Sequence, residues 1–456
     1  MQAAIDILHS IQERTDVSMI AIALVAVLGL CFGLPAGKAV RAGLTAGAGF
    51  IGLGLLFDLF DGVLTPAVQA MVENYGLSLD IVDLGEAPVA AVVSASQIGV
   101  LILPLGVAVN VLMLATNTTR TINIDLQGYR YFAYTGIMVQ SVAGSFSMGL
   151  AAAACNMIIV MIIADRMGPA LEKHMGLHGI SMPHGFAAAF VPIAFVMNKI
   201  VNYLPGLNRP KADMDALQKR FGILGEPALI GLVLGFVLVA LAEFGAVPAS
   251  DLLSDSLAAA VRMGAVFMLL PKVIAFLMEG VGALADAARA FMRKRFKNRG
   301  LIYIGTDAAL GVGHPLVLTA ASILAPLSVF LAVVLPGNRM LPFAGLAYIP
   351  YMLTAVVQIT GGAFFRSLLV GALTMTVMLY CGSGMSELLM RAAAETETYA
   401  NYLSGFSGIC GANPLTWVFA LLGRLSLTGL AIIAVISVGL ALENRGLIVK
   451  SAKKIN

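Results

Sequence analysis

The sequence predicts an all-α membrane protein that crosses the bilayer many times. Of its 456 residues, 59% are hydrophobic and only 12% are charged, about half the charged share of an average soluble protein. Two apolar runs, 131–165 and 342–380, are too long for one span, because the first would form a helix of about 50 Å against a hydrocarbon core of about 30 Å. We expect them to break at Gly144 and at the Gly361-Gly362 pair. The chain then has about eleven spans, in the apolar runs 17–34, 44–60, 97–115, 131–165, 226–245, 258–280, 314–335, 342–380 and 417–442.

Short motifs of the first half recur in the second half at a nearly constant offset. The stretch "MVQSVAGSF" aligns with "VVQITGGAF", which pairs Gln140 with Gln358. Two further pairs are "AVRAG" with "AVRMG" and "LGEA" with "GTDA", the second of which aligns Glu86 with Asp307. This regularity predicts two structural repeats within one membrane domain, residues 1–456: the repeats cover 17–220 and 226–425, and a last helix with a basic tail covers 426–456.

Charged residues predict how the two repeats are oriented. The 61–83 segment is acidic and has no Lys or Arg, whereas its counterpart at 281–300 is rich in both. Because Lys- and Arg-rich loops stay in the cytoplasm, matching segments would face opposite sides of the membrane. The repeats would then be inverted, with the acidic N-terminus outside and the basic 199–220 linker and C-terminus inside. Inverted repeats are typical of alternating-access transporters, whose substrate is bound where the repeats meet.

Polar residues at predicted helix starts are the candidates for that substrate site. Glu86 and Asp307 each open a short stretch of small residues before a full span, which we interpret as a half-helix that enters the membrane and returns. His184 follows Pro183 at a predicted helix start. His314 lies seven residues after Asp307, so that on one continuous helix the two side chains would share a face.

Each candidate also has a purely structural interpretation. Asp307 could cap a helix N-terminus, and His184 could be an interfacial histidine bonded to the backbone. Gln140 and Gln358 would be pseudo-symmetric partners in one substrate site, or else would hold packed helices together by hydrogen bonds. The sequence leaves these alternatives open.

Other features exclude several kinds of site. The four cysteines lie in or beside apolar segments, and their spacing fits neither a zinc site nor a disulfide framework. We expect no bound metal and no cofactor. The net charge of +3 is too small to indicate a protein that binds nucleic acid.

Seven motifs spread over nearly the whole chain are specific as a set. They are "GKAVRAGLTAGAGFIGLGLL", "MVENYGLSLDIVDLG", "SASQIGV", "ISMPHG", "FGILGEPALIGLVLG", "GTDAALGVGHPLVLTAASI" and "LPGNRMLPF". With them the chain resembles the enzyme IIC membrane subunit of the galactitol class of bacterial phosphoenolpyruvate-dependent sugar phosphotransferase systems. The resemblance implies a multi-pass protein of the bacterial plasma membrane with the fold of the related ascorbate class, a homodimeric elevator transporter with a scaffold and a mobile core. Substrate contacts of that class carry over to Gln140, His184 and Asp307, and a galactitol-class motif adds Gln97.

The resemblance also implies a mechanism. A polyol or sugar would be bound and translocated by this chain, and a separate IIB protein carrying a phosphocysteine, recharged by IIA, would phosphorylate it at the cytoplasmic face. The chain would carry no phosphorylation site of its own, and Asp307 or His184 would act as the base that accepts the hydroxyl proton. The full set of substrate-binding residues would be Glu86, Gln97, Gln140, His184, Asp307, His314 and Gln358.

Two other functions fit the same pattern. An ion-coupled secondary transporter could share the inverted-repeat plan, and it would use Glu86 or Asp307 to bind a proton or a sodium ion. A membrane sensor or scaffold is the other, although paired polar half-helices are unusual in such a protein.

Overall fold

The computed structural model describes residues 17–203, 226–295, 302–396, 399 and 405–455. The predictions for the acidic N-terminus and for most of the 199–220 linker fall outside these residues. So does the end of the basic 281–300 segment.

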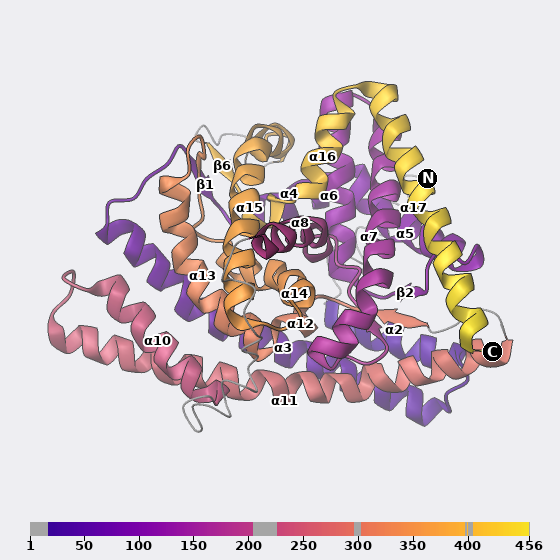
Figure 1. Ribbon diagram of the computed structural model, residues 1–456, viewed down its shortest axis with the longest axis horizontal. Coiled ribbons are helices and arrows are strands. Elements are labelled where there is room, and N and C mark those ends of the chain that lie inside the picture. The colour runs from indigo at the N-terminus through magenta and orange to yellow at the C-terminus, as the bar shows by residue number, and fades with distance from the viewer. Residues whose placement is uncertain (1–16, 204–225, 296–301, 397–398, 400–404, 456) are drawn as a thin grey trace.

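Apart from one extra 3-10 helix in the second half, helices and strands come in the same order in the two halves of the chain (Figure 1). The first half contains α2 (Val17–Cys31), α3 (Ala36–Asn74), β1 (Ile81–Asp83), α4 (Ala87–Ala95), α5 (Gln97–Ala115), β2 (Thr121–Asn123), α6 (Leu126–Ala143), α7 (Phe146–Met175), β3 (Ile180–Ser181), the 3-10 helix η1 (Ala187–Phe190) and α8 (Val191–Asn202). The second half contains α10 (Pro227–Glu243), α11 (Ala249–Arg295), β4 (Tyr303–Gly305), α12 (Ala309–Val312), α13 (Pro315–Val334), β5 (Met340–Leu341), η3 (Leu346–Tyr348), α14 (Ile349–Thr360), α15 (Phe364–Ala393), β6 (Phe406–Ser407), η4 (Ile409–Gly411) and α16 (Pro414–Gly423). The last helix is α17 (Ser426–Ile455).

Both predicted helix breaks are confirmed. Helix α6 ends at Gly144, whose φ of 65° is left-handed, and α14 ends at Gly361 with a φ of 68°. Glycine adopts this conformation without the steric cost that a Cβ brings, so it ends the helix and lets the chain turn back. Helices α7 and α15 then begin within three residues of these glycines.

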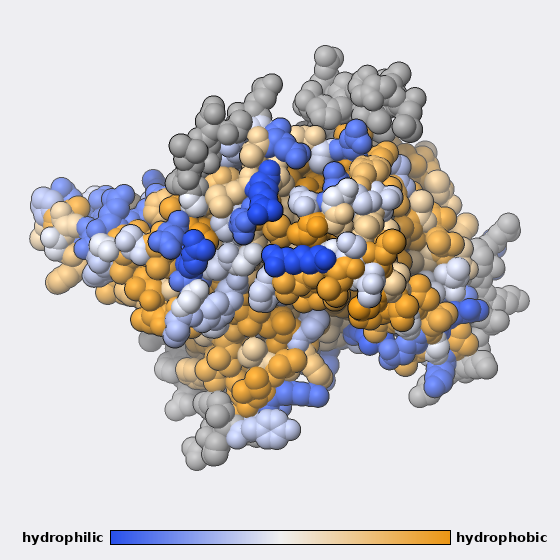
Figure 2. Space-filling model, turned by 90° about the horizontal axis from the view of Figure 1, so that it is seen from above, coloured by the Kyte–Doolittle hydropathy of each residue, from blue (hydrophilic) through white to orange (hydrophobic). Residues whose placement is uncertain are grey.

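The helices confirm a multi-pass, mainly helical membrane protein. Among the described residues, seven helices are long and apolar enough to cross a membrane, and several shorter apolar helices accompany them. Large aliphatic side chains such as Leu55, Val435 and Leu442 are exposed on these helices, as expected for surfaces that contact lipid. Hydrophobic residues accordingly cover much of the surface in Figure 2.

Two small parallel sheets were not predicted, because their strands are too short to show a period in the sequence. One sheet has the order β5-β1-β6 and the other has the order β2-β4-β3. In each sheet the central strand comes from one half of the chain and the two outer strands come from the other half. The halves are therefore interlocked.

The molecule has a base layer, which we define as α2, α3, α10 and α11, and an upper layer that contains most of the other helices (Figure 1). Helix α11 has 47 residues and is about 70 Å long. It crosses α3 closely, because a Cβ added at Gly280 would lie 2.5 Å from the Ala42 carbonyl oxygen. The predicted segments at 61–83 and 281–300 are thus largely continuations of α3 and α11 rather than loops.

Candidate functional site

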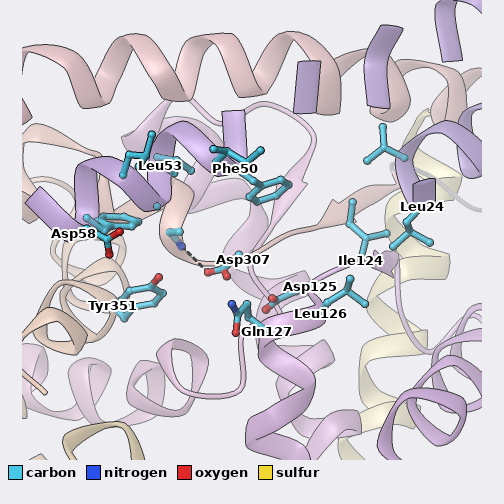
Figure 3. A pocket seen from close by; sticks show the side chains of 16 residues that line it. Leu24, Phe50, Leu53, Asp58, Ile124, Asp125, Leu126, Gln127, Asp307 and Tyr351 are labelled. Carbon is cyan, nitrogen blue, oxygen red and sulfur yellow. Dashed lines mark hydrogen bonds between the residues drawn. The ribbon is translucent and has the colours of Figure 1, made fainter. Parts of the chain in front are cut away.

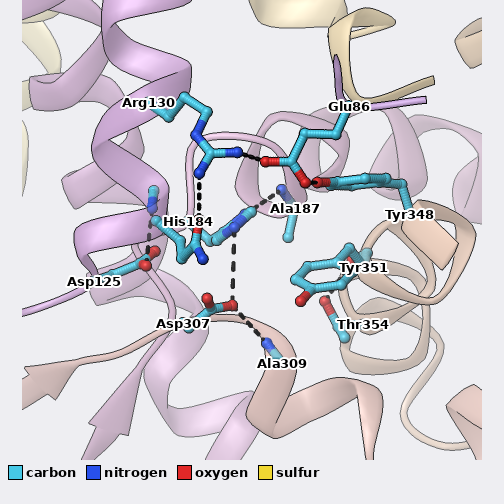
Figure 4. A network of polar contacts seen from close by, with 12 residues as sticks. Glu86, Asp125, Arg130, His184, Ala187, Asp307, Ala309, Tyr348, Tyr351 and Thr354 are labelled. Atoms are coloured by element: carbon cyan, nitrogen blue, oxygen red, sulfur yellow. Dashed lines mark hydrogen bonds and ion pairs between the residues drawn. The ribbon is translucent and has the colours of Figure 1, made fainter. Parts of the chain in front are cut away.

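Three strands of one sheet deliver three polar side chains to one point. Strand β2 leads to Asp125, β3 leads to His184, and β4 leads to Asp307. Because the strands are parallel, their carboxyl ends meet at one edge of the sheet. One side-chain ligand atom from each residue lies within 4.8 Å of those of the other two. This arrangement brings together two predicted residues, His184 and Asp307, with one that the sequence did not indicate (Figure 4).

Buried hydrogen bonds hold this sheet in place. The Thr121 hydroxyl lies 2.8 Å from that of Ser181, which links β2 to β3. The Asp165 carboxylate accepts hydrogen bonds from the Arg120 backbone N–H and from the Asn444 amide, at 2.9 and 2.8 Å. Such satisfied buried polar groups fix the strand ends, and with them the positions of the site residues.

His184 is held between two tyrosine rings. Its ring centroid lies 5.1 Å from that of Tyr131 and 5.3 Å from that of Tyr351, and only 2% of the residue is exposed. Its Nδ1 accepts the Ala187 backbone N–H at 3.3 Å, so in the neutral ring the proton is on Nε2. The prediction of a helix starting at Pro183 is wrong, because residues 182–184 are irregular and η1 begins only at Ala187, whose N–H the His184 ring accepts.

Asp307 lies opposite the donating nitrogen of His184. Its Oδ1 is 3.9 Å from Nε2 and accepts the Ala309 backbone N–H at 2.8 Å. Its side chain is 14% exposed. Asp307 thus accepts the first backbone N–H of the short helix α12, whose N-cap residue is Ala308, and it also lines a cavity.

That cavity has a volume of about 370 Å³ and lies between the two layers (Figure 3). Helices α2 and α3 line one side with mostly apolar residues, together with the carboxylate of Asp58. The upper layer contributes Asp125, Gln127, Asp307 and Tyr351. The cavity combines an apolar wall with hydrogen-bonding groups on the other side, which is typical of sites for small polar molecules.

Glu86 belongs to a neighbouring ion pair. Its carboxylate pairs with the Arg130 guanidinium and also accepts a hydrogen bond from the Tyr348 hydroxyl (Figure 4). Arg130 in turn donates to the Gln127 side-chain oxygen at 2.9 Å. Through Gln127 this network reaches the cavity, so Glu86 lies beside the site but does not line the cavity.

The other predicted residues lie elsewhere. Gln97 and Gln140 line a second polar cavity of about 480 Å³ near the C-terminal end of α6. Thirteen residues of α6 separate Gln140 from Gln127, which corresponds to about 20 Å. Gln358 is buried on α14 with its amide 4.0 Å from the Met182 sulfur. The structure therefore does not bring the two aligned glutamines into one cavity.

His314 also has a different place from the one predicted. Helix α12 ends at Val312 and α13 begins at Pro315, so no continuous helix joins Asp307 to His314. The expected shared face is wrong. His314 instead caps α13, where its Nδ1 accepts the Leu316 N–H at 3.3 Å.

The Asp125–His184–Asp307 cluster resembles a metal site in composition but not in donor chemistry. A histidine that binds a metal through Nε2 normally donates a hydrogen bond from Nδ1. Here Nδ1 is the acceptor, so Nε2 presents a proton rather than a lone pair. The cluster is better suited to hydroxyl groups, which accept from Nε2–H and donate to carboxylates.

Comparison with known proteins decides the family. Residues 15–398 match the family model for the sugar-specific permease component of phosphotransferase systems, EIIC-GAT. The chain belongs to this family. It is 32% identical over 424 residues to the putative permease IIC component of Escherichia coli K12, covering 92% of this chain and 95% of the relative. It is 33% identical over 410 residues to the galactitol-specific EIIC component of the same strain, covering 87% and 89%.

The family establishes what this permease does in outline. It is the membrane-spanning subunit of a sugar phosphotransferase system, with a sugar substrate and with IIA and IIB proteins as partners. The ion-coupled transporter is consequently not favoured. The sequence did not indicate Asp125, Gln127, Arg130 or Tyr351, although the polar stretch "DLQGYR" directly before the 131–165 run contains the first three.

Proposed function

We propose that this permease binds and translocates a polyol similar to galactitol, which IIB then phosphorylates at the cytoplasmic face. The observation that carries the proposal is that Asp307 lines the inter-layer cavity and that its Oδ1 lies 3.9 Å from the Nε2 of His184, which is buried directly behind it. A carboxylate accepts hydrogen bonds from hydroxyl groups and the imidazole N–H donates to them, which suits a neutral polyol. The 33% identity to galactitol-specific relatives supports the same substrate class.

The two layers support an elevator mechanism. The base layer would be the scaffold, and the upper layer would be the core that carries the substrate. The cavity lies where the layers meet, so that a movement of one layer along the other would carry a bound molecule with it. The resemblance to the ascorbate class supports a homodimer.

The repeated element order supports inverted repeats at 17–220 and 226–425, with residues 426–456 appended. The strand order of the sheets also supports them, because β5-β1-β6 corresponds strand by strand to β2-β4-β3 when the halves are exchanged. A two-fold relation of this kind accounts for the sequence motifs that recur.

Within the site, Asp307 would accept the proton of the hydroxyl group that receives the phosphoryl group. The oxygen–phosphorus bond forms as the sulfur–phosphorus bond of the IIB phosphocysteine breaks, and the thiolate leaves with IIB. His184 would bind and orient the substrate through Nε2–H. Phosphoryl transfer depends mainly on the positioning of the reactants and on charge stabilisation, so a well-placed base increases its rate by only a limited factor.

Uptake of radiolabelled galactitol into membrane vesicles tests the function. We expect accumulation as a phosphate ester when IIA, IIB and the phosphodonor are present, and none when a proton or sodium gradient is the only driving force. Uptake of unmodified galactitol against its gradient, driven by ions alone, would instead support the secondary transporter. A thermal-shift screen against polyols and sugars would identify the substrate independently.

Orientation is a separate prediction. Single cysteines replacing Glu73 and Lys294, in a protein whose four native cysteines are changed to serine, should react with a membrane-impermeant maleimide from opposite sides. We expect Glu73→Cys to label from outside and Lys294→Cys from the cytoplasm. The end of α3 is acidic and the end of α11 is basic, and basic segments stay on the cytoplasmic side of the membrane. Labelling of both positions from the same side would rule out inverted repeats.

A further inference from the structure

Gln127 is a polar residue of the inter-layer cavity that neither the sequence motifs nor the mechanism above uses. It lies in the first turn of α6 and lines the cavity together with Asp307. Its Oε1 accepts a hydrogen bond from Nη2 of Arg130, three residues further along the helix, at 2.9 Å. Because an arginine can only donate, the amide atom that faces it must be the oxygen. The amide nitrogen is therefore the atom that faces away from Arg130.

This nitrogen is available to a ligand. Figure 3 shows it on the side of Asp307, with the amide oxygen on the opposite side. Among the described residues, Nε2 of Gln127 has no hydrogen-bond partner, and it is not one of their buried unpaired side-chain atoms. It is therefore accessible where Gln127 lines the cavity. The cavity wall thus offers an N–H donor beside the carboxylate of Asp307, which is an acceptor.

An ion pair fixes the orientation of this amide. Arg130 uses Nη2 for Gln127 and a different nitrogen, Nη1, for the carboxylate of Glu86, which also accepts from the Tyr348 hydroxyl (Figure 4). The side chains of Arg130 and Glu86 are only 26% and 38% exposed, so salt screens their attraction less than that of a surface pair. A glutamine without such a partner could turn either its oxygen or its nitrogen to a ligand. The Glu86–Arg130 pair selects the nitrogen.

We propose that Gln127 is a substrate-binding residue that selects for a hydroxyl group, and that Glu86 and Arg130 are positioning residues that hold its N–H toward the substrate. This rests on the proposed function in that the ligand is a polyol. A hydroxyl group both accepts and donates, so one hydroxyl can accept from the Gln127 N–H and donate to the Asp307 carboxylate. A deoxy carbon at this position can do neither. It would leave the polar groups of the cavity wall without partners, which is the basis of the selectivity.

Binding of galactitol and of its 1-, 2- and 3-deoxy analogues tests the contact. We expect Gln127→Met, which has a side chain of similar length without an N–H, to bind galactitol about tenfold more weakly than the wild type. One analogue, which lacks the hydroxyl that Gln127 contacts, should bind the wild type about tenfold more weakly than galactitol but bind Gln127→Met with nearly its wild-type affinity. Equal weakening of all four ligands by Gln127→Met would overturn the contact. The wild type alone also tests it, because the inference is wrong if all three analogues bind as well as galactitol.

A double-mutant comparison tests the positioning residues. Glu86→Gln combined with Arg130→Met removes both members of the ion pair, so that no charge stays unpaired. We expect about tenfold weaker galactitol binding in the wild-type background but little further loss in the Gln127→Met background, because the pair acts through Gln127. Losses that add would overturn the positioning role. The control is Glu387→Gln with Arg391→Met, an exposed pair on α15 whose removal should leave binding unchanged.

The wild type separates this inference from the proposed function. If it binds no polyol, the proposed function fails and this inference fails with it. If it binds galactitol and Gln127→Met binds galactitol equally well, only this inference fails.

Discussion

Asp307→Asn is expected to bind galactitol while its IIB-dependent phosphorylation falls by about 10²-fold, the low end for a lost general base. Asparagine keeps the size of aspartate and its ability to accept the Ala309 N–H, so the start of α12 keeps this hydrogen bond. It cannot take up the hydroxyl proton as the phosphoryl group arrives. The measurement is phosphate-ester formation by purified permease with phosphorylated IIB at saturating galactitol, next to equilibrium binding without IIB.

His184→Gln is the matching comparison. His184 offers one N–H between two tyrosine rings, and glutamine retains a donor but neither the ring nor its packing. We expect binding to weaken by about tenfold, with a smaller effect on the rate at saturation. A normal phosphorylation rate in Asp307→Asn would make Asp307 a ligand or a helix cap only. If neither substitution affects binding or rate, the substrate is bound elsewhere, for example in the second cavity.

Local chemistry explains which parts of the fold the sequence predicts. An apolar run too long for one membrane span must break, and a glycine within it is where a helix ends most easily. The breaks after Ala143 and Thr360 were therefore predictable. The sheets were not, because β1 to β6 have only two or three residues each and are formed by pairing between distant segments. Without the sheets, the sequence gives no reason for Asp125, His184 and Asp307 to meet.

The glutamines show what an internal alignment can and cannot predict. Gln140 and Gln358 do occupy equivalent positions, each a few residues before a left-handed glycine. Equivalent positions in two repeats need not share a location, and these two line different cavities. The glutamine that lines the Asp307 cavity is instead Gln127, which lies at the N-terminal end of α6, whereas Gln140 lies near its C-terminal end. Its position depends on how α6 packs against α5, α7 and α16, which the sequence of α6 alone does not contain.

Asp83→Ala should prevent stable folding. Asp83 is the last residue of the acidic 61–83 segment, which the charge pattern predicts outside the membrane, but it is fully buried at the end of β1. Its carboxylate accepts four backbone N–H groups: those of Gly85, Phe343, Gly345 and Ile409, at 2.7 to 3.1 Å. These groups belong to three segments from both halves of the chain, so one side chain joins the loops that follow β1, β5 and β6.

Alanine would leave all four donors without this acceptor in the interior. At about 1–3 kcal/mol for each unsatisfied buried group, the loss is about 4 kcal/mol or more, a large part of the 5–15 kcal/mol that typically stabilises a domain. The stability of Asp83→Asn should lie between those of the wild type and Asp83→Ala. The one side-chain oxygen of asparagine can accept from only one pair of donors, and its NH₂ group faces the other pair. The measurement is the amount of protein in the membrane and the melting temperature of purified protein in detergent.

Asp80→Asn is the control for Asp83. Asp80 lies three residues earlier and is exposed, and its carboxylate contacts only the Arg339 guanidinium at 3.4 Å among the contacts in the described part of the chain. An exposed ion pair of this kind contributes about 0–1 kcal/mol, so the melting temperature should hardly change. A wild-type melting temperature for Asp83→Ala would mean that water or a rearranged loop replaces the carboxylate. A large drop in Asp83→Ala alone would show that a buried acceptor, and not the negative charge of the segment, is what this part of the fold requires.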